Sequence, residues 1–227
     1  METASISVSS PIGSRRDYFF GIISGFAIGI LLLPILKTAK PELFFSLKFV
    51  IVPIFTVLVP LALVIASWIS YRIPLVWQLA KFIITGALNT LVDIGTLSYM
   101  LFLASVSSYH IASNDILFTL FVPIAFFTLY KGISFLIANT NSYFWNKYWT
   151  FGASNTQKKS STEFIQFLII SFIGFIINIS ISSLIFGAPY GTNRMSIDQW
   201  ALISAVIGSI VGFTWNFIGY KFFVFKI

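Results

Sequence analysis

Long apolar runs alternate with short polar stretches along most of this chain. Each apolar run is close to the ~20 residues that a helix needs to cross a bilayer. The pattern predicts an all-α, polytopic transmembrane helical bundle of about six spans. The expected spans cover residues 18–36, 49–68, 79–103, 129–148, 164–186 and 200–220.

Residues 116–151 depart from this pattern, because they are too long for one span and too short for two spans with a turn. Pro123 interrupts the apolar run. One interpretation is an interfacial or re-entrant segment over residues 116–128 that leads into the fourth span. The other is a single long, kinked helix.

The composition agrees with a membrane protein and argues against a water-soluble one. Hydrophobic residues make up 57% of the chain and charged residues only 9%, whereas soluble domains carry about 25% charge. The net charge of +7 comes from basic residues that are scattered between apolar runs rather than gathered in a stripe. We therefore expect contacts with membrane lipids and no nucleic-acid partner.

The distribution of Lys and Arg predicts the orientation, because cytoplasmic loops carry an excess of these residues. It places both termini on the cytoplasmic side of the inner membrane and makes residues 1–17 a disordered cytoplasmic tail. The residues expected on the cytoplasmic side are Arg15, Arg16, Arg72, Lys81, Lys147, Lys158, Lys159, Lys221 and Lys226, and those expected outside are Lys37, Lys40, Lys48 and Arg194.

Catalytic and metal-binding patterns are missing from the sequence. It has no cysteine, its single histidine is His110, and its seven acidic residues are far apart. No Gly-rich phosphate loop follows a strand pattern. We expect neither a metal site nor a cofactor, and no enzymatic activity.

The last four predicted spans form two similar hairpins. Residues 82–86 (FIITG) open the first and residues 167–171 (FLIIS) open the second. The hairpins end in residues 146–151 (NKYWTF) and 220–225 (YKFFVF). Because both enter from the same side, a pseudo-two-fold axis along the membrane normal would relate them.

Several ordered motifs in residues 78–225 resemble the GtrA/GtcA family. These motifs are residues 86–93 (GALNTLVD), Ala138-Asn139, 146–151, 215–217 (WNF) and 221–225 (KFFVF). The resemblance implies a small four-span protein of cell-surface polysaccharide synthesis or glycosylation, working beside a glycosyltransferase that uses polyprenyl phosphate. It further implies that such a protein flips polyprenyl-phosphate-linked sugars. Three parts are then expected: the tail 1–17, two additional helices in 18–75, and a GtrA-like four-helix domain in 76–227.

Ionisable residues inside the bilayer are costly, so Asp93 and Lys131 require a partner or a function. Counting a ~1.5 Å rise per residue, both lie deep in the membrane, and we expect them to form a pair. Asp93 also belongs to a polar face with Thr85 and Asn89, at helical spacing. Polar faces on the other three helices of the domain would line a path with it.

The leading hypothesis is translocation of a polyprenyl-phosphate-linked sugar. The residues expected to bind the sugar are Asn89, Asp93, Asn139, Asn146, Asn178 and Asn216, and those expected to attract the phosphate are Lys81, Lys147 and Lys221. One alternative is a non-transporting membrane partner that positions a glycosyltransferase. Another is a proton-coupled exporter of small cations with Asp93 as the carrier. The spacing of Gly21, Gly25 and Gly29 also suits a homodimer.

Overall fold

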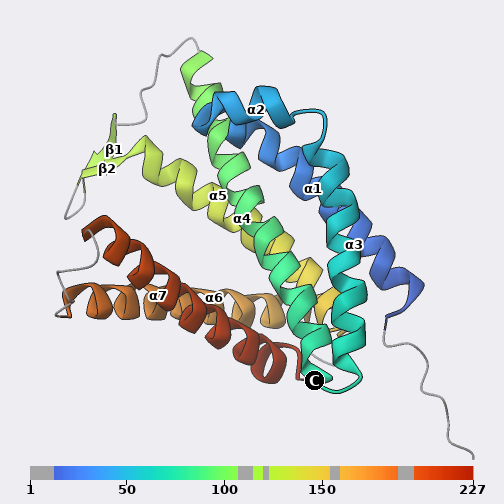
Figure 1. The fold of residues 1–227 in the computed structure, drawn as a ribbon. Coiled ribbons are helices and arrows are strands. Elements are labelled where there is room, and N and C mark those ends of the chain that lie inside the picture. The colour runs from blue at the N-terminus through green and yellow to red at the C-terminus, as the bar shows by residue number, and fades with distance from the viewer. Residues whose placement is uncertain (1–12, 107–114, 120–122, 154–158, 189–196, 227) are drawn as a thin grey trace, which may run out of the picture. The chain divides into compact units, whose positions relative to one another are not determined.

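The computed structural model describes residues 13–106, 115–119, 123–153, 159–188 and 197–226. Internal contacts divide the chain into two compact units, Met1–Thr150 and Phe151–Ile227. The first unit contains the two additional helices together with the first hairpin of the repeat, and the second contains the other hairpin (Figure 1).

Helix α1 (Arg15–Ala39) opens the first unit with a capping box. The Ser14 hydroxyl accepts from the Asp17 amide, and the Asp17 carboxylate accepts from the Ser14 amide. These contacts satisfy two backbone donors that a helix start would otherwise leave unpaired. The helix thus begins within the stretch predicted as a disordered tail, while residues 1–12 lie outside the described part.

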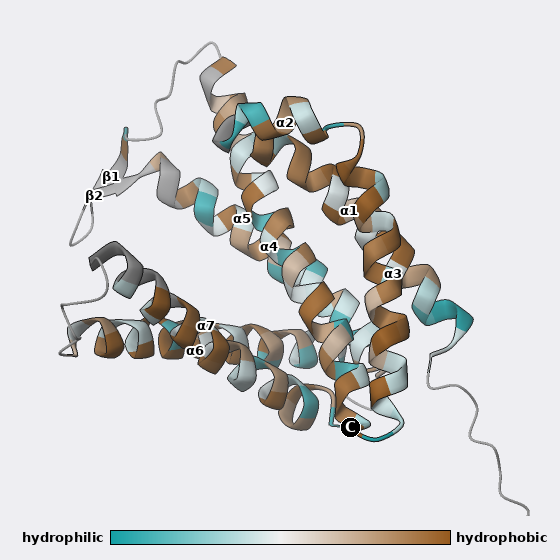
Figure 2. Ribbon diagram, in the orientation of Figure 1, coloured by the Kyte–Doolittle hydropathy of each residue, from teal (hydrophilic) through white to brown (hydrophobic). Residues whose placement is uncertain are grey.

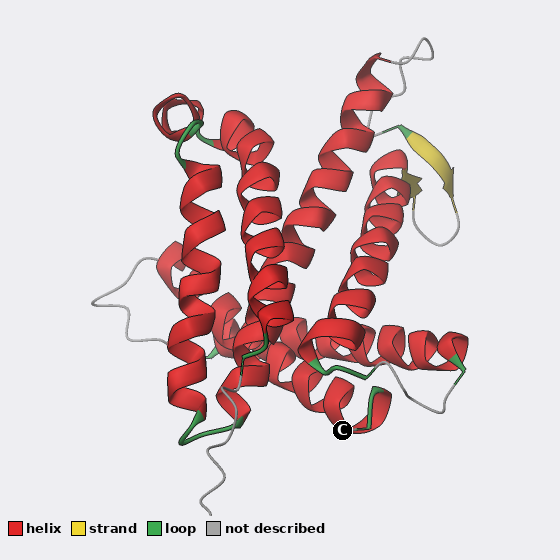
Figure 3. Cartoon of the chain, turned by 90° about the vertical axis from the view of Figure 1, so that its right-hand side faces the viewer, coloured by secondary structure: helices red, strands yellow, loops and turns green. Residues whose placement is uncertain are grey.

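Helix α3 (Ile51–Ser70) packs closely along α1, and both views show the two side by side (Figures 1 and 3). The glycines of α1 make this approach possible. A Cβ atom added at Gly29 would lie 2.7 Å from the Cα of Val52, and one at Gly25 would overlap the carbonyl of Phe55. The face suggested for a homodimer is therefore covered by α3 of the same chain.

A short helix that the sequence did not predict, α2 (Pro41–Leu47), connects α1 to α3. It runs across the ends of its neighbours and has no buried residue (Figure 1). The ammonium of Lys48 lies over the rings of Phe45 and Phe49, 5.5 and 4.9 Å from their centroids. Exposed rings beside a cation are typical of a segment at the membrane interface.

Helix α4 (Leu75–Val106) follows a turn at Pro74, which lies between the second and third predicted spans. It packs against α1 and α3, and side chains of these three helices form the core of the unit with Trp149. The core comprises Ile28, Val59, Leu63, Ala66, Trp77, Ile84, Leu88 and Trp149.

The stretch for which the sequence left two interpretations open contains a small antiparallel pair of strands, β1 (Ile116–Thr119) and β2 (Pro123–Ala125). Helix α5 (Phe126–Trp145) follows directly. The single long kinked helix is therefore wrong for this stretch, because Pro123 begins a paired strand. A short extended hairpin gives the backbone the hydrogen bonds that an irregular segment would lack.

The second unit pairs α6 (Ser160–Gly187) with α7 (Ile197–Gly219) through small residues. A Cβ atom at Gly212 would lie 2.7 Å from the carbonyl oxygen of Gly174, and one at Gly208 would overlap the hydroxyl of Ser182. Such close backbone approach is a common way for helices to associate in membranes. The glycines of this hairpin serve packing.

The two hairpins end in the same unusual structure. The five-residue π-helices η1 (Asn146–Thr150) and η2 (Tyr220–Val224) follow α5 and α7, and each has a Lys at its second position. The Phe residues after these turns, Phe151 and Phe225, contact each other with ring centroids 5.3 Å apart. The repeat seen in the sequence is therefore also a repeat of secondary structure.

The helices have the length and surface of a membrane protein. Among the described residues, four helices are long and apolar enough to cross a bilayer: Arg15–Lys37, Ile51–Ser70, Leu75–Ala104 and Ser160–Gly187. Hydrophobic residues colour most of their ribbons brown in Figure 2, and many large apolar side chains are exposed, among them Phe49 and Trp68. The predicted polytopic helical membrane bundle is confirmed, and the exact number of spans stays a prediction.

Candidate functional site

Polar side chains connect α4 with α5 and η1 along the length of the first hairpin. We call this set the α4–α5 seam: Lys81, Thr85, Asn89 and Asp93 on α4, with Lys131, Ser134, Asn146 and Thr150 opposite. The α4 members recur every four residues and so share one face of the helix. Because α4 and α5 are antiparallel, early residues of α4 meet the end of α5 and η1.

Asp93 and Lys131 form an ion pair in the seam. The second carboxylate oxygen of Asp93 accepts a hydrogen bond of 2.7 Å from the Ser134 hydroxyl. The sequence suggested the pair but not Ser134, although a hydroxyl three residues after Lys131 lies on the same helix face. Each charge therefore has a partner of opposite sign in the apolar part of the chain, as expected within a bilayer.

Thr85 and Thr150 share a hydrogen bond of 3.2 Å nearer the other end of the seam, and both are almost fully buried. Thr150 was not predicted as a site residue. A signal was available, because the repeat placed this β-branched residue in the ending common to both hairpins.

Two amide oxygens of the seam are buried without a hydrogen-bond partner, Oδ1 of Asn89 and Oδ1 of Asn146. Asn146 is 1% exposed, and its Nδ2 donates to the Ser142 carbonyl at 2.8 Å. That bond fixes the orientation of the amide, because only the nitrogen can donate to a carbonyl. Buried acceptors of this kind are costly unless a donor reaches them.

Lys81 lies at the end of the seam nearest η1 and is bound on two sides. Its ammonium donates to the Asp17 carboxylate at 3.2 Å and to the Trp149 carbonyl at 2.9 Å, and it lies over the Trp77 ring. The sequence predicted Lys81 as a cation that attracts phosphate. It did not predict Asp17, although Ser14 and Asp17 have the spacing of a capping box.

The other two predicted phosphate residues differ in exposure. Lys147 is buried and donates to the Tyr143 hydroxyl at 3.2 Å on its own helix. Lys221 is half-buried and lies over the Phe222 ring. Both lysines occupy the second position of a π-helix.

The remaining predicted asparagines contact groups of their own helix or hairpin. Nδ2 of Asn139 donates to the Phe135 carbonyl at 2.9 Å. Asn178 lies 3.4 Å from the Ser209 hydroxyl, across α6 and α7. Oδ1 of Asn216 is buried without a hydrogen-bond partner and closely approaches Gly174. Asn178 and Asn216 thus belong to the α6–α7 contact, and the seam belongs to the first unit.

The second unit also carries a groove that sequence reasoning missed. It has a volume of about 320 Å³ and is lined by Gln166, Ile169, Ile170, Phe222, Phe223 and Lys226. The lining comes from α6 and from the segment around η2. An apolar floor with an amide and an ammonium beside it suits a lipid chain with an anionic headgroup.

No group of three or more potential ligands that could hold a metal occurs among the residues that the structure describes.

Comparison with known proteins gives the family of the chain. The model of the GtrA/DPMS transmembrane domain matches residues 81–225, which is most of the sequence. No curated protein and no solved structure compared with the chain matched it. The match begins at Lys81, ends just after η2, and includes the seam residues on both helices of the first hairpin. The chain belongs to the GtrA/DPMS transmembrane-domain family.

Proposed function

We propose that this protein translocates polyprenyl-phosphate-linked sugars across the membrane. The family suggests a part in handling such lipids, and its members are in general non-catalytic membrane proteins. The single observation that supports translocation best is the α4–α5 seam. It holds hydrogen-bonding groups along a membrane helix, where a sugar would otherwise lose its contacts with water.

Such a lipid has a charged phosphate and a polar sugar. The phosphate carries charge, and a charge crossing hydrocarbon without a partner is opposed by tens of kcal/mol in the Born limit. In our proposal the amides and hydroxyls of the seam receive the sugar. The prenyl chain stays in the lipid.

The cation-exporter alternative is less well supported. A proton-coupled carrier needs a carboxylate that exchanges its proton for a cargo cation. Both oxygens of Asp93 are already engaged, one by the Lys131 ammonium and one by the Ser134 hydroxyl. A fixed ammonium beside the carboxylate would also repel a cation.

The test is reconstitution of the purified protein in vesicles that contain a short-chain prenyl-phosphate glucose. We expect the probe to equilibrate between leaflets faster than in protein-free vesicles. The matched variant Asp93→Asn/Lys131→Met should be slower, provided that it folds as judged by gel filtration. Transfer at the protein-free rate would contradict the proposal, and co-purification with a glycosyltransferase would then support the positioning role.

A further inference from the structure

The groove of the second unit is built by one face of α6 and the segment that follows α7. Gln166, Ile169 and Ile170 lie three and four positions apart on α6, so they share a face of the helix. The rest of the lining comes from η2 and the residues that follow it. The whole groove therefore belongs to the second unit.

Helix α7 holds the floor of this groove in place. The indole Nε1 of Trp215 donates to the Ile170 carbonyl at 3.2 Å, across the two helices. A Cβ atom added at Gly219 would lie 2.5 Å from Cγ2 of Ile170, so the glycine lets this side chain pack against α7. The groove is thus a fixed feature of the close-packed hairpin.

The polar and apolar residues of the groove are ordered along the axis of α6. Contacts of the α7 glycines show that α6 and α7 are antiparallel, so the start of α6 lies at the same end of the hairpin as η2. Gln166 is in the second turn of α6, and Ile169 and Ile170 lie about one turn deeper. An amide and the Lys226 ammonium towards the end, with hydrocarbon further in, is the order of headgroup and acyl chain in a bilayer leaflet.

The charge at the groove is positive. Lys226 is exposed in its lining, and the Lys221 ammonium lies 5.6 Å from the centroid of the Phe222 ring, which also lines it. None of the lining residues, all of which the structure describes, is acidic. Glu163, one turn before Gln166 on α6, is fully buried. The groove thus presents two cations to an anionic headgroup and no lining carboxylate to a cationic one.

From the shape, the order of polarity and the charge of this groove we infer that it binds an anionic glycerophospholipid of the bilayer, such as phosphatidylglycerol. One acyl chain lies along Ile169 and Ile170, and the phosphodiester pairs with the ammonium groups of the two lysines. A zwitterionic phospholipid carries its own ammonium, for which this lining has no partner. The inference is independent of which lipid the protein transports.

The exposure of the groove identifies the surrounding bilayer as the source of this lipid. Ile169, Phe222 and Phe223 are 52%, 56% and 62% exposed, so the groove opens outward to membrane lipid. The Lys and Arg distribution predicts this end of the hairpin to be cytoplasmic, and the cytoplasmic leaflet carries the anionic lipids. A phospholipid from that leaflet reaches the groove without crossing the membrane.

Native mass spectrometry of the delipidated full-length protein tests the inference. The probes are phosphatidylglycerol and phosphatidylethanolamine with identical acyl chains. We expect one phosphatidylglycerol per chain to bind about twentyfold more tightly than phosphatidylethanolamine, since each of two lysines near a lipid surface contributes about fivefold. Equal affinities for the two lipids would overturn the inference.

Lys226→Gly is the charge variant. Lys226 has a φ of 50°, a left-handed backbone conformation that glycine adopts more easily. The variant should therefore keep or raise the thermal midpoint, while its affinity for phosphatidylglycerol falls about fivefold. Lys48→Gln is the matched control, because the Lys48 ammonium also lies over aromatic rings but lines no part of this groove. An equal loss of affinity in both variants would indicate diffuse attraction by charge and overturn the inference.

Ile169→Trp tests the groove with every charge retained. The position is half exposed, so the larger ring fits without disturbing the core and fills the place of the acyl chain. We expect affinity for phosphatidylglycerol to fall about tenfold. If this variant fails to fold, Phe223→Ala replaces it, because it removes one wall of the groove at an exposed position. Unchanged affinity in a folded variant would contradict the inference.

Prenyl phosphate, the other source of a lipid phosphate, serves as the competitor. We expect an equimolar amount to displace less than half of the bound phosphatidylglycerol, because the methyl branches of its chain need more width than a straight acyl chain. Larger displacement would assign the groove to the transported lipid and overturn the inference. Failure of transfer in the vesicle assay would contradict only the proposed function.

Discussion

The ammonium of Lys81 lies 3.2 Å from the carboxylate of Asp17, across 64 positions of the sequence. The contact joins the first additional helix to the residue at which the family match begins. Together with the packing of α1 and α3 against α4, it makes the additional helices part of one unit with the first hairpin.

Asp17→Asn should destabilise the protein more than Ser14→Ala does. Ser14→Ala removes one cap hydrogen bond, with a cost of about 1 kcal/mol. Asp17→Asn removes the ion pair as well and leaves a mostly buried ammonium without its carboxylate, so we expect a cost of about 2–3 kcal/mol. Unfolding by SDS titration measures both, and equal costs would mean that the pair with Lys81 contributes nothing.

Asp93→Asn and Lys131→Met should each destabilise the protein by about 1–3 kcal/mol, because each leaves an unpaired charge in the membrane. The double variant should cost less than the sum, with a coupling energy of about 1–2 kcal/mol. Strictly additive losses in the same titration would show that the two charges do not interact.

Gly208→Ala should destabilise the α6–α7 hairpin by about 1–3 kcal/mol, since the new methyl group meets Ser182 and the Asn178 carbonyl oxygen at 2.5 Å. Gly132→Ala in α5 is the matched control. Its methyl group has nothing within 4 Å, and alanine favours helix, so stability should be unchanged or rise by up to about 1 kcal/mol. The thermal midpoints of the two variants in detergent measure this difference. Equal midpoints would contradict the prediction.

Tyr220→Phe should cost about 1 kcal/mol, because it removes the 2.6 Å hydrogen bond with Ser171 and retains the ring that stacks on Phe167. In a cycle with Ser171→Ala, the second substitution should add little to the first. If the losses of stability from Tyr220→Phe and Ser171→Ala were additive, the hydrogen bond between the two hydroxyls would not be the source of the stabilisation.

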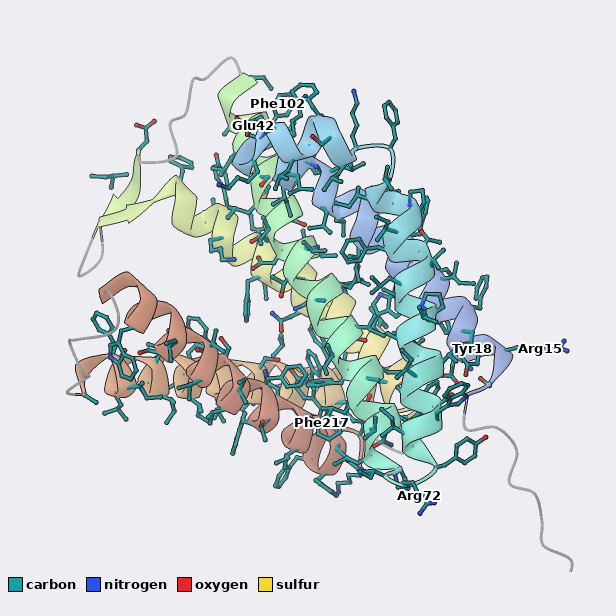
Figure 4. The ribbon with its side chains drawn as sticks, in the orientation of Figure 1. Arg15, Tyr18, Glu42, Arg72, Phe102 and Phe217 are labelled. Atoms are coloured by element: carbon teal, nitrogen blue, oxygen red, sulfur yellow. The ribbon has the colours of Figure 1, made fainter. Side chains whose placement is uncertain are left out.

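The orientation can be tested directly, since the chain contains no cysteine. Figure 4 shows Arg72 at one end of the first unit and Glu42 at the other. With both termini cytoplasmic, Arg72→Cys should react with an impermeant thiol reagent only in inside-out vesicles, and Glu42→Cys only in intact spheroplasts. The reverse pattern would invert the predicted topology.

Much of the fold was predictable because a helix that spans a membrane requires a long run of apolar residues. The shared ending of the hairpins, for example, follows from local sequence. Helix α2 was not predicted because a seven-residue helix is too short to give a hydropathy signal. The strands around Pro123 were missed for the same reason, since three or four residues of strand look like any apolar segment.

The candidate site was only partly predictable. Asp93 and Lys131 stood out because charge is rare inside apolar segments. Asp17 did not, because its partner is distant in sequence and its own surroundings are polar. Nor could the sequence show that Asn139 and Asn146 each donate to a carbonyl one turn earlier, or that Asn146 also keeps a buried oxygen without a partner. That distinction depends on side-chain geometry.

The division of the chain after Thr150 bears on how the protein is made. The ribosome synthesises the first unit, with both partners of the ion pairs Lys81–Asp17 and Lys131–Asp93, before the final hairpin emerges. Helices α6 and α7 then pack against each other through their close-packed glycines, and this contact needs no residue of the first unit. Insertion into the membrane can therefore proceed in two steps, one for each unit, and the groove lined by α6 and the segment around η2 forms in the later step.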